Sequence, residues 1–386
     1  MTTFIDTSAL LSGQEADDQD PVVVVVRSAQ GMLREGLGES ASATFETAFA
    51  EKYAAKEWSS IFDLLLGNSE VVFEKIASVD EAEAALRVSK TAEGYFEVVL
   101  SIMSKMETVE DVVGRIHSFV RTMSTPSSSS AVQSVKLKLL VTLLASISPK
   151  AQLRISIING LCRFAAGNEK MSNQVYALVK DVDSWIVENE WEVEDSERLE
   201  LFANVRGVAP AADAIEFLKK EVAIASGDAK TNLAETLVVS AVKTEGYFGF
   251  ADLESLPVSP TASNLVKILA EGTFADMESF ASSAEGKTWL ASASVVAEVL
   301  LEKMRVMALI SLVGTSRKIS MKSIAESLKT NDAFSVVVRA IRAGLIRGSI
   351  DEVEGVVIVT GVVSRNLKSV LKTVAADVSS IAARLA

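Results

Sequence analysis

Residues 331–360 read NDAFSVVVRAIRAGLIRGSIDEVEGVVIVT, and this stretch decides the fold. Asn331-Asp332 predicts the start of a helix, because these side chains cap helix N-termini. Apolar residues then recur at three- and four-residue steps, as on one helical face, namely Phe334, Val337, Val338, Ile341 and Leu345. Two alternating segments follow, Ile346–Ile350 and Val356–Thr360, with an acidic turn between them. They predict a β-hairpin.

The residues before this stretch predict two more helices, at Val296–Val313 and from Ile319-Ser320 to Leu328. Three short helices followed by a two-stranded hairpin is the element order of a winged helix, here residues 299–361. The second hairpin strand is short and β-branched, and we expect it to be an exposed edge that pairs with a partner's strand. Its expected interface residues are Val356, Val357, Ile358 and Val359.

A last helix is predicted within residues 362–386, and it has no obvious core of its own. Its apolar stripe is therefore expected to pack on a partner helix. The residues of that stripe that we expect at the interface are Leu367, Val370, Leu371, Val374 and Val378.

The remainder of the chain predicts helical repeats, because only 6 Pro and 20 Gly interrupt its 386 residues. Amphipathic segments recur at roughly 20-residue spacing, which is typical of stacked helical hairpins. We therefore expect an all-α fold with a small β-hairpin: a helical-repeat solenoid followed by the winged helix. The expected divisions are an irregular segment at 1–40, repeats at 41–123, a flexible Ser-rich linker at 124–131 and further repeats at 132–298.

Composition argues against a membrane or secreted protein. The apolar run Val22–Val26 is far shorter than the ~20 residues that a membrane-spanning helix needs, and its own role is left open. The first residues have no basic segment of the kind that opens a signal peptide. A single cysteine excludes an intrachain disulfide bond. We expect a cytoplasmic protein.

The charge is unevenly distributed along the chain. The net charge is −13, but residues 300–386 carry 13 Lys and Arg against 7 Asp and Glu, a balance of +6 that leaves −19 for the first 299 residues. An acidic body repels nucleic acid at long range, whereas a basic end can make a local contact with phosphate or with an acidic partner.

Several stretches resemble the PCI proteins of the proteasome lid, the signalosome and, most closely, translation initiation factor 3. The resemblance is carried by Phe4-Ile5-Asp6, Leu137–Leu140, Trp185-Ile186, Phe248–Val258, Lys303-Met304-Arg305, Ile319-Ser320 and Val337–Ile346. It covers most of residues 130–386, with the PCI helical part from about 200. It implies a scaffold without catalytic residues, which joins other PCI and MPN subunits of initiation factor 3 and supports initiation on the small ribosomal subunit. The lid and the signalosome share this architecture and stay open as alternatives.

No residue pattern in the sequence indicates an enzyme, a metal, a cofactor or a small-molecule substrate. His117 is the only histidine, and neither a Gly-x-Ser-x-Gly elbow nor a phosphate-binding glycine loop is present. Cys162 lies on an apolar stripe and is interpreted as a small buried hydrophobe. The acidic run Glu188–Glu200 is interpreted as a solvated connector rather than a cation site.

A second hypothesis is a winged-helix regulator that binds RNA or DNA. Arg339 and Arg342 lie three positions apart on the third helix, where a DNA-reading winged helix contacts bases, and Arg347 adds charge nearby. The wing, however, carries three acidic residues. Because a nucleic-acid reader usually has a denser basic face, protein docking is the favoured interpretation.

Overall fold

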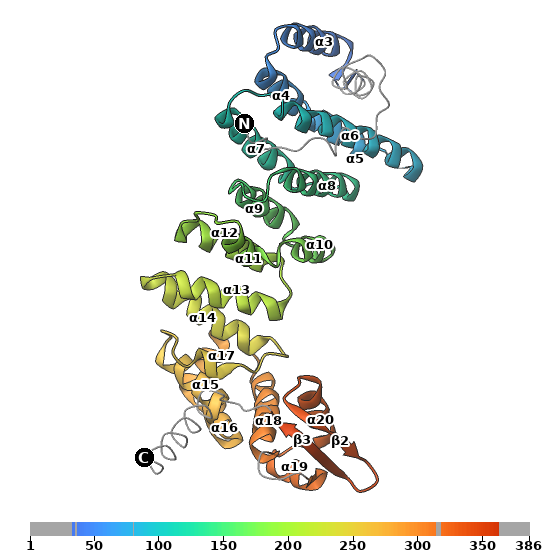
Figure 1. Cartoon of the computed structure of the whole chain (residues 1–386). Coiled ribbons are helices and arrows are strands. Elements are labelled where there is room, and N and C mark those ends of the chain that lie inside the picture. Colours follow the sequence, from blue (N-terminus) through green and yellow to red (C-terminus); the bar gives the residue numbers. More distant parts are fainter. Residues whose placement is uncertain (1–32, 35–36, 80, 314–317, 363–386) are drawn as a thin grey trace, which may run out of the picture. The chain divides into compact units, whose positions relative to one another are not determined.

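The computed structural model describes residues 33–34, 37–79, 81–313 and 318–362. These residues are mostly helical, with one three-stranded antiparallel sheet (Figure 1). The chain divides into two compact units, Met1–Pro210 and Ala211–Ala386. No helix of the described part is long and apolar enough to cross a membrane. The valine run and the predicted last helix, with all its expected interface residues, lie outside the described residues.

The first unit is a stack of helices in which each packs on its neighbours along the chain (Figure 1). Buried Phe, Leu, Ile and Val side chains on one face of each helix form the core, which confirms the expected helical repeats. The described helices are α3 (Glu39–Ala54), α4 (Trp58–Gly67), α5 (Ser69–Ala77), α6 (Ala82–Met103), α7 (Val109–Met123), α8 (Ser130–Ser146), α9 (Arg154–Ala165), α10 (Glu169–Val179), α11 (Val182–Glu188) and α12 (Asp195–Val208).

The Ser-rich segment connects α7 and α8, and specific hydrogen bonds form within it. The hydroxyl of Ser129 accepts a hydrogen bond from the amide of Val132 and caps α8. The side-chain amide of Gln133 donates to the carbonyl of Ser127 at 2.6 Å. Serine is common in linkers, but it is also a preferred N-cap residue, and here the capping role prevails.

The helical part of the second unit packs around one apolar cluster that includes Phe250, Leu265 and Met277. Its elements are the helices α13 (Ala211–Ile224), α14 (Gly227–Lys243), α15 (Pro260–Glu271), α16 (Phe274–Ser282) and α17 (Ala284–Ser292), with the 3-10 turn η1 (Phe250–Leu253) between α14 and α15.

The winged helix is present as predicted. Its helices are α18 (Ala297–Val313), α19 (Met321–Ser327) and α20 (Ala333–Arg342), and its hairpin strands are β2 (Ile346–Asp351) and β3 (Val356–Val362). The side chain of Asp332 accepts from the amide of Ser335 and starts α20, as the sequence indicated. Alternate residues of β3, Val357 and Val359, enter a core with Val337 and Leu309.

A third strand, β1 (Lys318–Ser320), corrects the prediction for the hairpin. The strand order is β1-β3-β2, so Val356, Val357 and Ile358 pair on both sides. The prediction that Val356–Val359 is an exposed edge strand is therefore wrong. Strand β1 was not predicted because its three residues are too few to establish an alternating pattern. Its last residue, Ser320, is also the N-cap of α19.

Candidate protein-docking site

The outer face of the winged-helix sheet is the main candidate site, and it centres on Ile358. The antiparallel register aligns Lys318, Ile358 and Ser349 in one row across the three strands. Directly opposed residues share a face, and all three side chains are exposed, with Ile358 at 39%. The next outward row is Ser320, half-buried Val356 and Asp351. The face thus has an apolar centre and a polar rim.

The opposite face of the same sheet belongs to the core. Val357 is 1% exposed and Val359 is 7% exposed, and both contact the helices of the winged helix. A charge introduced at either position would be buried without a partner and would unfold the module. Of the four strand residues that were expected at an interface, only Ile358 and Val356 reach the outer face.

β2 is the longer of the two edge strands of the sheet, and among the described strands it pairs only with β3. Its register shifts between Arg347 and Gly348, a local bulge. At Gly348 a Cβ atom would lie 2.3 Å from the carbonyl oxygen of Ile358, so the two backbones approach too closely for any side chain. The exposed side chains of Arg347 and Ser349 flank this glycine. An unpaired strand of this kind can accept another strand.

The wing is a rigid turn at the end of the sheet. The Asp351 carboxylate accepts from the amides of Val353 and Glu354 at 3.1 and 3.0 Å. Gly355 has φ +64°, in the left-handed region that glycine adopts without strain. Glu354 forms an ion pair with Lys318 of β1 at 2.5 Å. Val353 is left 98% exposed at the tip of the turn.

Lys303 connects the first helix of the winged helix to the helical part of the unit. Its ammonium donates to the carbonyl oxygens of Ala241, Val242 and Thr244 at 2.7, 3.0 and 2.7 Å. The first two are carbonyls of the last turn of α14, which have no partner within the helix, and Thr244 follows that helix. The side chain is 5% exposed, and the rings of Phe248 and Phe250 lie 5.7 and 5.3 Å from its nitrogen. Burial lowers the pKa of Lys303 to about 7.

The other residues of the Lys303-Met304-Arg305 motif also hold the winged helix in place. Met304 is fully buried, and the Arg305 guanidinium lies 5.4 Å from the ring centre of Phe274 in α16 and 2.8 Å from Glu298. The motif that resembled the PCI family is thus a set of contacts between α18 and the preceding helices. Sequence reasoning did not assign Lys303 to the core, although it follows Leu300 by three positions and precedes Met307 by four on the apolar stripe.

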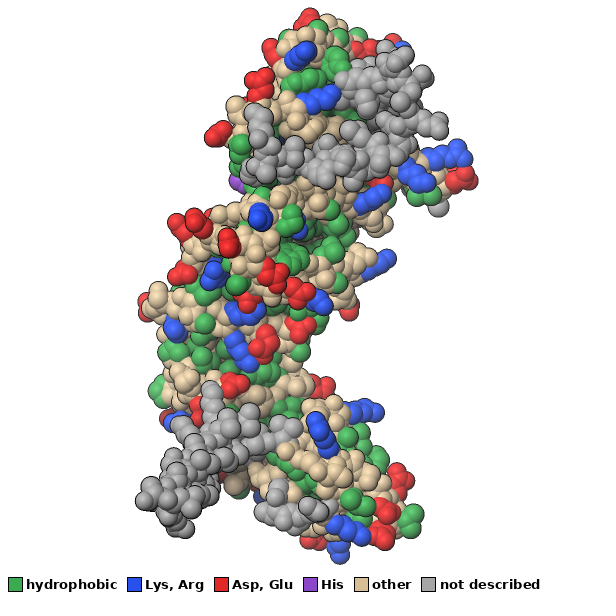
Figure 2. Space-filling model, viewed as in Figure 1, with side chains coloured by type: hydrophobic (Ala, Val, Ile, Leu, Met, Phe, Trp, Pro, Cys, Tyr) green, Lys and Arg blue, Asp and Glu red, His purple; other side chains and the backbone are tan. Residues whose placement is uncertain are grey.

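The three arginines that were expected to contact RNA do not form one basic surface. Arg339 forms an ion pair with Glu302 of α18 at 2.5 Å. The hydrogen bond that Arg339 donates to the Glu302 carboxylate raises the pKa of Arg339. Arg342, at the end of α20, and Arg347, on β2, are exposed. On the face of the winged helix drawn in Figure 2, basic and acidic side chains are interspersed. This pattern suits protein contacts better than a phosphate backbone.

The remaining candidate residues, namely His117, Cys162 and the acidic run Glu188–Glu200, lie in the first unit. His117 is exposed on α7. Cys162 is fully buried on α9, and burial raises the pKa of its thiol to about 12, well above the range of a reactive cysteine. The seven acidic side chains of Glu188–Glu200 are exposed, whereas Trp191 among them is buried and donates to the carbonyl of Pro149 at 3.0 Å. Within the described ranges, no three His, Cys, Asp or Glu side chains cluster as metal ligands.

This chain is similar to a known domain family in its C-terminal part and to named proteins over most of its length. Residues 277–360, from α16 to β3, match the family model of the PCI domain. The chain is similar to eukaryotic translation initiation factor 3 subunit M from Dictyostelium discoideum, with 21% identity over 376 residues that cover 92% of this chain and 87% of that protein. Proteins of the same name from Yarrowia lipolytica and Coccidioides immitis are each 27% identical, over 69% and 60% of this chain and 71% and 54% of their own lengths.

Proposed function

We propose that this chain is a non-catalytic scaffold subunit of a translation initiation factor 3 complex in the cytoplasm. In this proposal the winged helix joins other PCI and MPN subunits, and the assembly supports initiation on the small ribosomal subunit. The observation that carries the proposal is the winged-helix sheet, which has one face in the core and the other open to a partner around Ile358. The similarity to subunit M proteins along most of the chain supports the choice of complex.

The corrected strand order changes which residues the docking surface uses. Partner contact is assigned to Ile358 and to the free edge of β2, in place of the buried Val357 and Val359. An apolar centre with a polar rim is the usual anatomy of a protein–protein interface. The predicted helix at 362–386 stays part of the proposal as a second contact.

The test compares lysine substitutions at two exposed positions of the winged helix, Ile358 and Val353. Full-length tagged chain with Ile358→Lys or Val353→Lys is expressed in its own cells, and the co-purifying proteins are quantified by mass spectrometry. Ile358→Lys is expected to reduce recovery of the other initiation factor 3 subunits by about tenfold, the effect of ~1.4 kcal/mol on binding. Val353→Lys, at the wing tip, is expected to retain them. Thermal melting of both variants checks that the fold is intact.

Equal recovery with both variants would refute docking through the outer sheet face. Recovery of proteasome-lid or signalosome subunits instead would keep the interface but move the function to protein degradation. Recovery of nucleic acid without protein subunits, lost when Arg342 and Arg347 are replaced by Ala, would favour the nucleic-acid-binding regulator.

A further inference from the structure

The first unit contains an open groove of about 860 Å³ that the proposed function does not use. Helices α7, α9 and α12 form its walls, together with the turn that precedes α9. All of its lining residues fall between Val113 and Glu200, so the groove belongs to the first unit alone. It is therefore independent of the winged-helix sheet.

Both apolar and polar side chains line the groove, and its uncharged polar residues are Ser124, Gln152, Ser156 and Asn159. Val113 and Val120 of α7 face it, and Leu153 and Ile155 line the other side. Asn159 of α9 also lines the groove and is only 7% exposed. Its side-chain oxygen accepts from the amide of Asn204 at 3.0 Å, which fixes the orientation of the Asn159 side chain.

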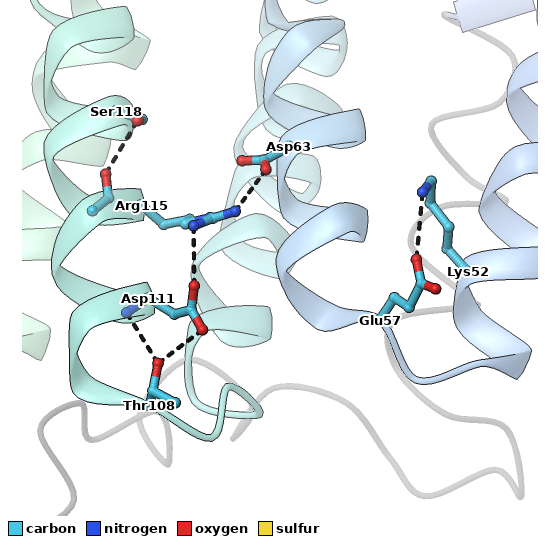
Figure 3. A network of polar contacts seen from close by, with 8 residues as sticks. Lys52, Glu57, Asp63, Thr108, Asp111, Arg115 and Ser118 are labelled. Atoms are coloured by element: carbon cyan, nitrogen blue, oxygen red, sulfur yellow. Dashed lines mark hydrogen bonds and ion pairs between the residues drawn. The ribbon is translucent and has the colours of Figure 1, made fainter.

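The wall formed by α7 is fixed from both sides. Arg115 reaches Asp63 of α4 at 2.8 Å and Asp111 at 3.2 Å, while Thr108 caps the helix (Figure 3). On the other side, a Cβ at Gly160 of α9 would lie 2.3 Å from the Val120 side chain, so α7 and α9 are in close contact. A fixed groove loses little conformational entropy when it binds a ligand.

Charges of opposite sign line the two rims. His117 and Arg121 stand exposed on the α7 rim, and within the described part of the chain Arg121 forms no ion pair. Glu197 and Glu200 stand on the α12 rim, where Glu200 is paired with Arg163. A ligand that complements this arrangement carries acidic groups on the side facing α7.

The helical walls also select the backbone conformation of the ligand. The three wall helices satisfy their own backbone groups, so the groove offers an extended peptide no strand edge with which to pair its amides and carbonyls. A helix satisfies its backbone internally and needs only apolar side chains at i, i+3, i+4 and i+7. We propose that the groove binds one amphipathic helix of a partner protein, with its acidic side toward His117 and Arg121.

The test places a photo-crosslinking amino acid, p-benzoylphenylalanine, at His117 of the full-length chain in its own cells. A matched control carries it at Leu86 of α6, which is 57% exposed and does not line the groove. Adducts are identified by mass spectrometry after denaturing purification. We expect adducts at position 117 to map to one segment of one protein, with helical apolar spacing and a carboxylate within one turn of the crosslinked residue.

Charge exchange then tests the orientation of the ligand. Arg121→Glu should reduce the yield of the adduct by about tenfold, and replacing the facing carboxylate of the partner by Arg should restore it. The control Arg87→Glu, on α6, should leave the yield unchanged. Circular dichroism of Arg121→Glu verifies the helical fold.

Four outcomes would overturn the proposal: no adduct above the Leu86 control, adducts spread over many proteins or on nucleic acid, adducts on residues 1–32 of this same chain, or a yield that Arg121→Glu does not change. None of these outcomes depends on whether the Ile358→Lys variant releases initiation factor 3 subunits, so the two proposals fail separately.

Discussion

Among the described residues, each unit contains one buried lysine that binds backbone at the end of another helix, and the two differ in what they connect. Lys136 of α8 is 4% exposed and donates to the carbonyl and the hydroxyl of Thr125, just beyond α7, 11 positions away. Lys303 of α18 is 5% exposed and donates to three carbonyls at the end of α14 and just beyond it, 59 to 62 positions away. Both nitrogens also face aromatic rings, Phe73 in the case of Lys136.

The comparison separates a local contact from one between helices that are distant in sequence. Lys136 fixes the turn between consecutive helices, which their apolar packing also specifies. Lys303 instead binds the carbonyls of Ala241 and Val242 and shares that of Thr244 with the amide of Tyr247, and it joins the winged helix to the helical part of its unit. Water would solvate the Thr125 end of the first site, because Thr125 is exposed, whereas the α14 carbonyls lie in the core.

The largest expected effect is that of Lys303→Met. Methionine fills the space of the side chain but leaves the buried carbonyls of Ala241 and Val242 without the lysine donor, and each unsatisfied group costs ~1–3 kcal/mol. We expect the second unit to lose about 3 kcal/mol or more of stability. Hydrogen–deuterium exchange of the full chain should show faster exchange in peptides from α14 and α18 and unchanged exchange in α4–α9. Protection of α14 at the level of the unsubstituted chain would contradict this assignment of Lys303.

Lys136→Met is expected to have a smaller and more local effect, about 1 kcal/mol, because water can replace the lysine at the exposed Thr125. The same exchange experiment should show faster exchange only near the end of α7 and the start of α8. A loss of protection as large as that in Lys303→Met would remove the distinction between the two sites.

Stability should also depend on pH, and per pH unit this effect is smaller than that of Lys303→Met. The pKa of Lys303 falls to about 7 in the folded chain, below the ordinary lysine value of 10.5. Between these values the unfolded chain holds a proton that the folded chain has released, so the stability of the second unit rises as pH increases above 7. The slope approaches ~1.4 kcal/mol per pH unit for one proton. Lys303→Met should flatten this slope.

Burial also lowers the pKa of Lys136, with the charge of Glu70 acting in the opposite direction. The first unit should therefore show a slope of the same sign and smaller size. Exchange rates corrected for the intrinsic effect of pH, measured between pH 7 and 9, provide the comparison. A steeper slope in the first unit would reverse the ranking of the two sites.

Sequence patterns revealed the parts of the fold that local spacing determines. The Asp332 cap of α20 and the alternation in β3 were readable, and so was the helix rhythm of both units. The stripe predicted for α20 was partly wrong, because the buried residues are Ala333, Val336, Val337 and Ala340, whereas Phe334 is 48% exposed. Strand β1 was not readable, because three residues cannot establish a period, and its existence decides that Val357 is internal. The burial of Lys303 was not predicted for another reason, because a lysine side chain is normally exposed. Only its contact with the end of α14, which is distant in sequence, makes its burial favourable.

The groove of the first unit was equally hidden from sequence reasoning. His117, the only histidine of the sequence, is exposed on α7. What the sequence could not show is that α7, α9 and α12 bring Arg121 and Glu197 to opposite rims of one cavity. Packing between helices that are far apart in the chain creates that arrangement.

The short strand β1 has a consequence for the stoichiometry of assembly. A sheet with two long free edges can add strands in both directions and so polymerise. Here β1 covers the first residues of β3 with only three residues of its own, while β2 presents six along its outer side. Among the described strands, therefore, β2 presents the longer continuous edge. A second chain that adds one strand to the sheet is expected to pair there, one partner strand per sheet.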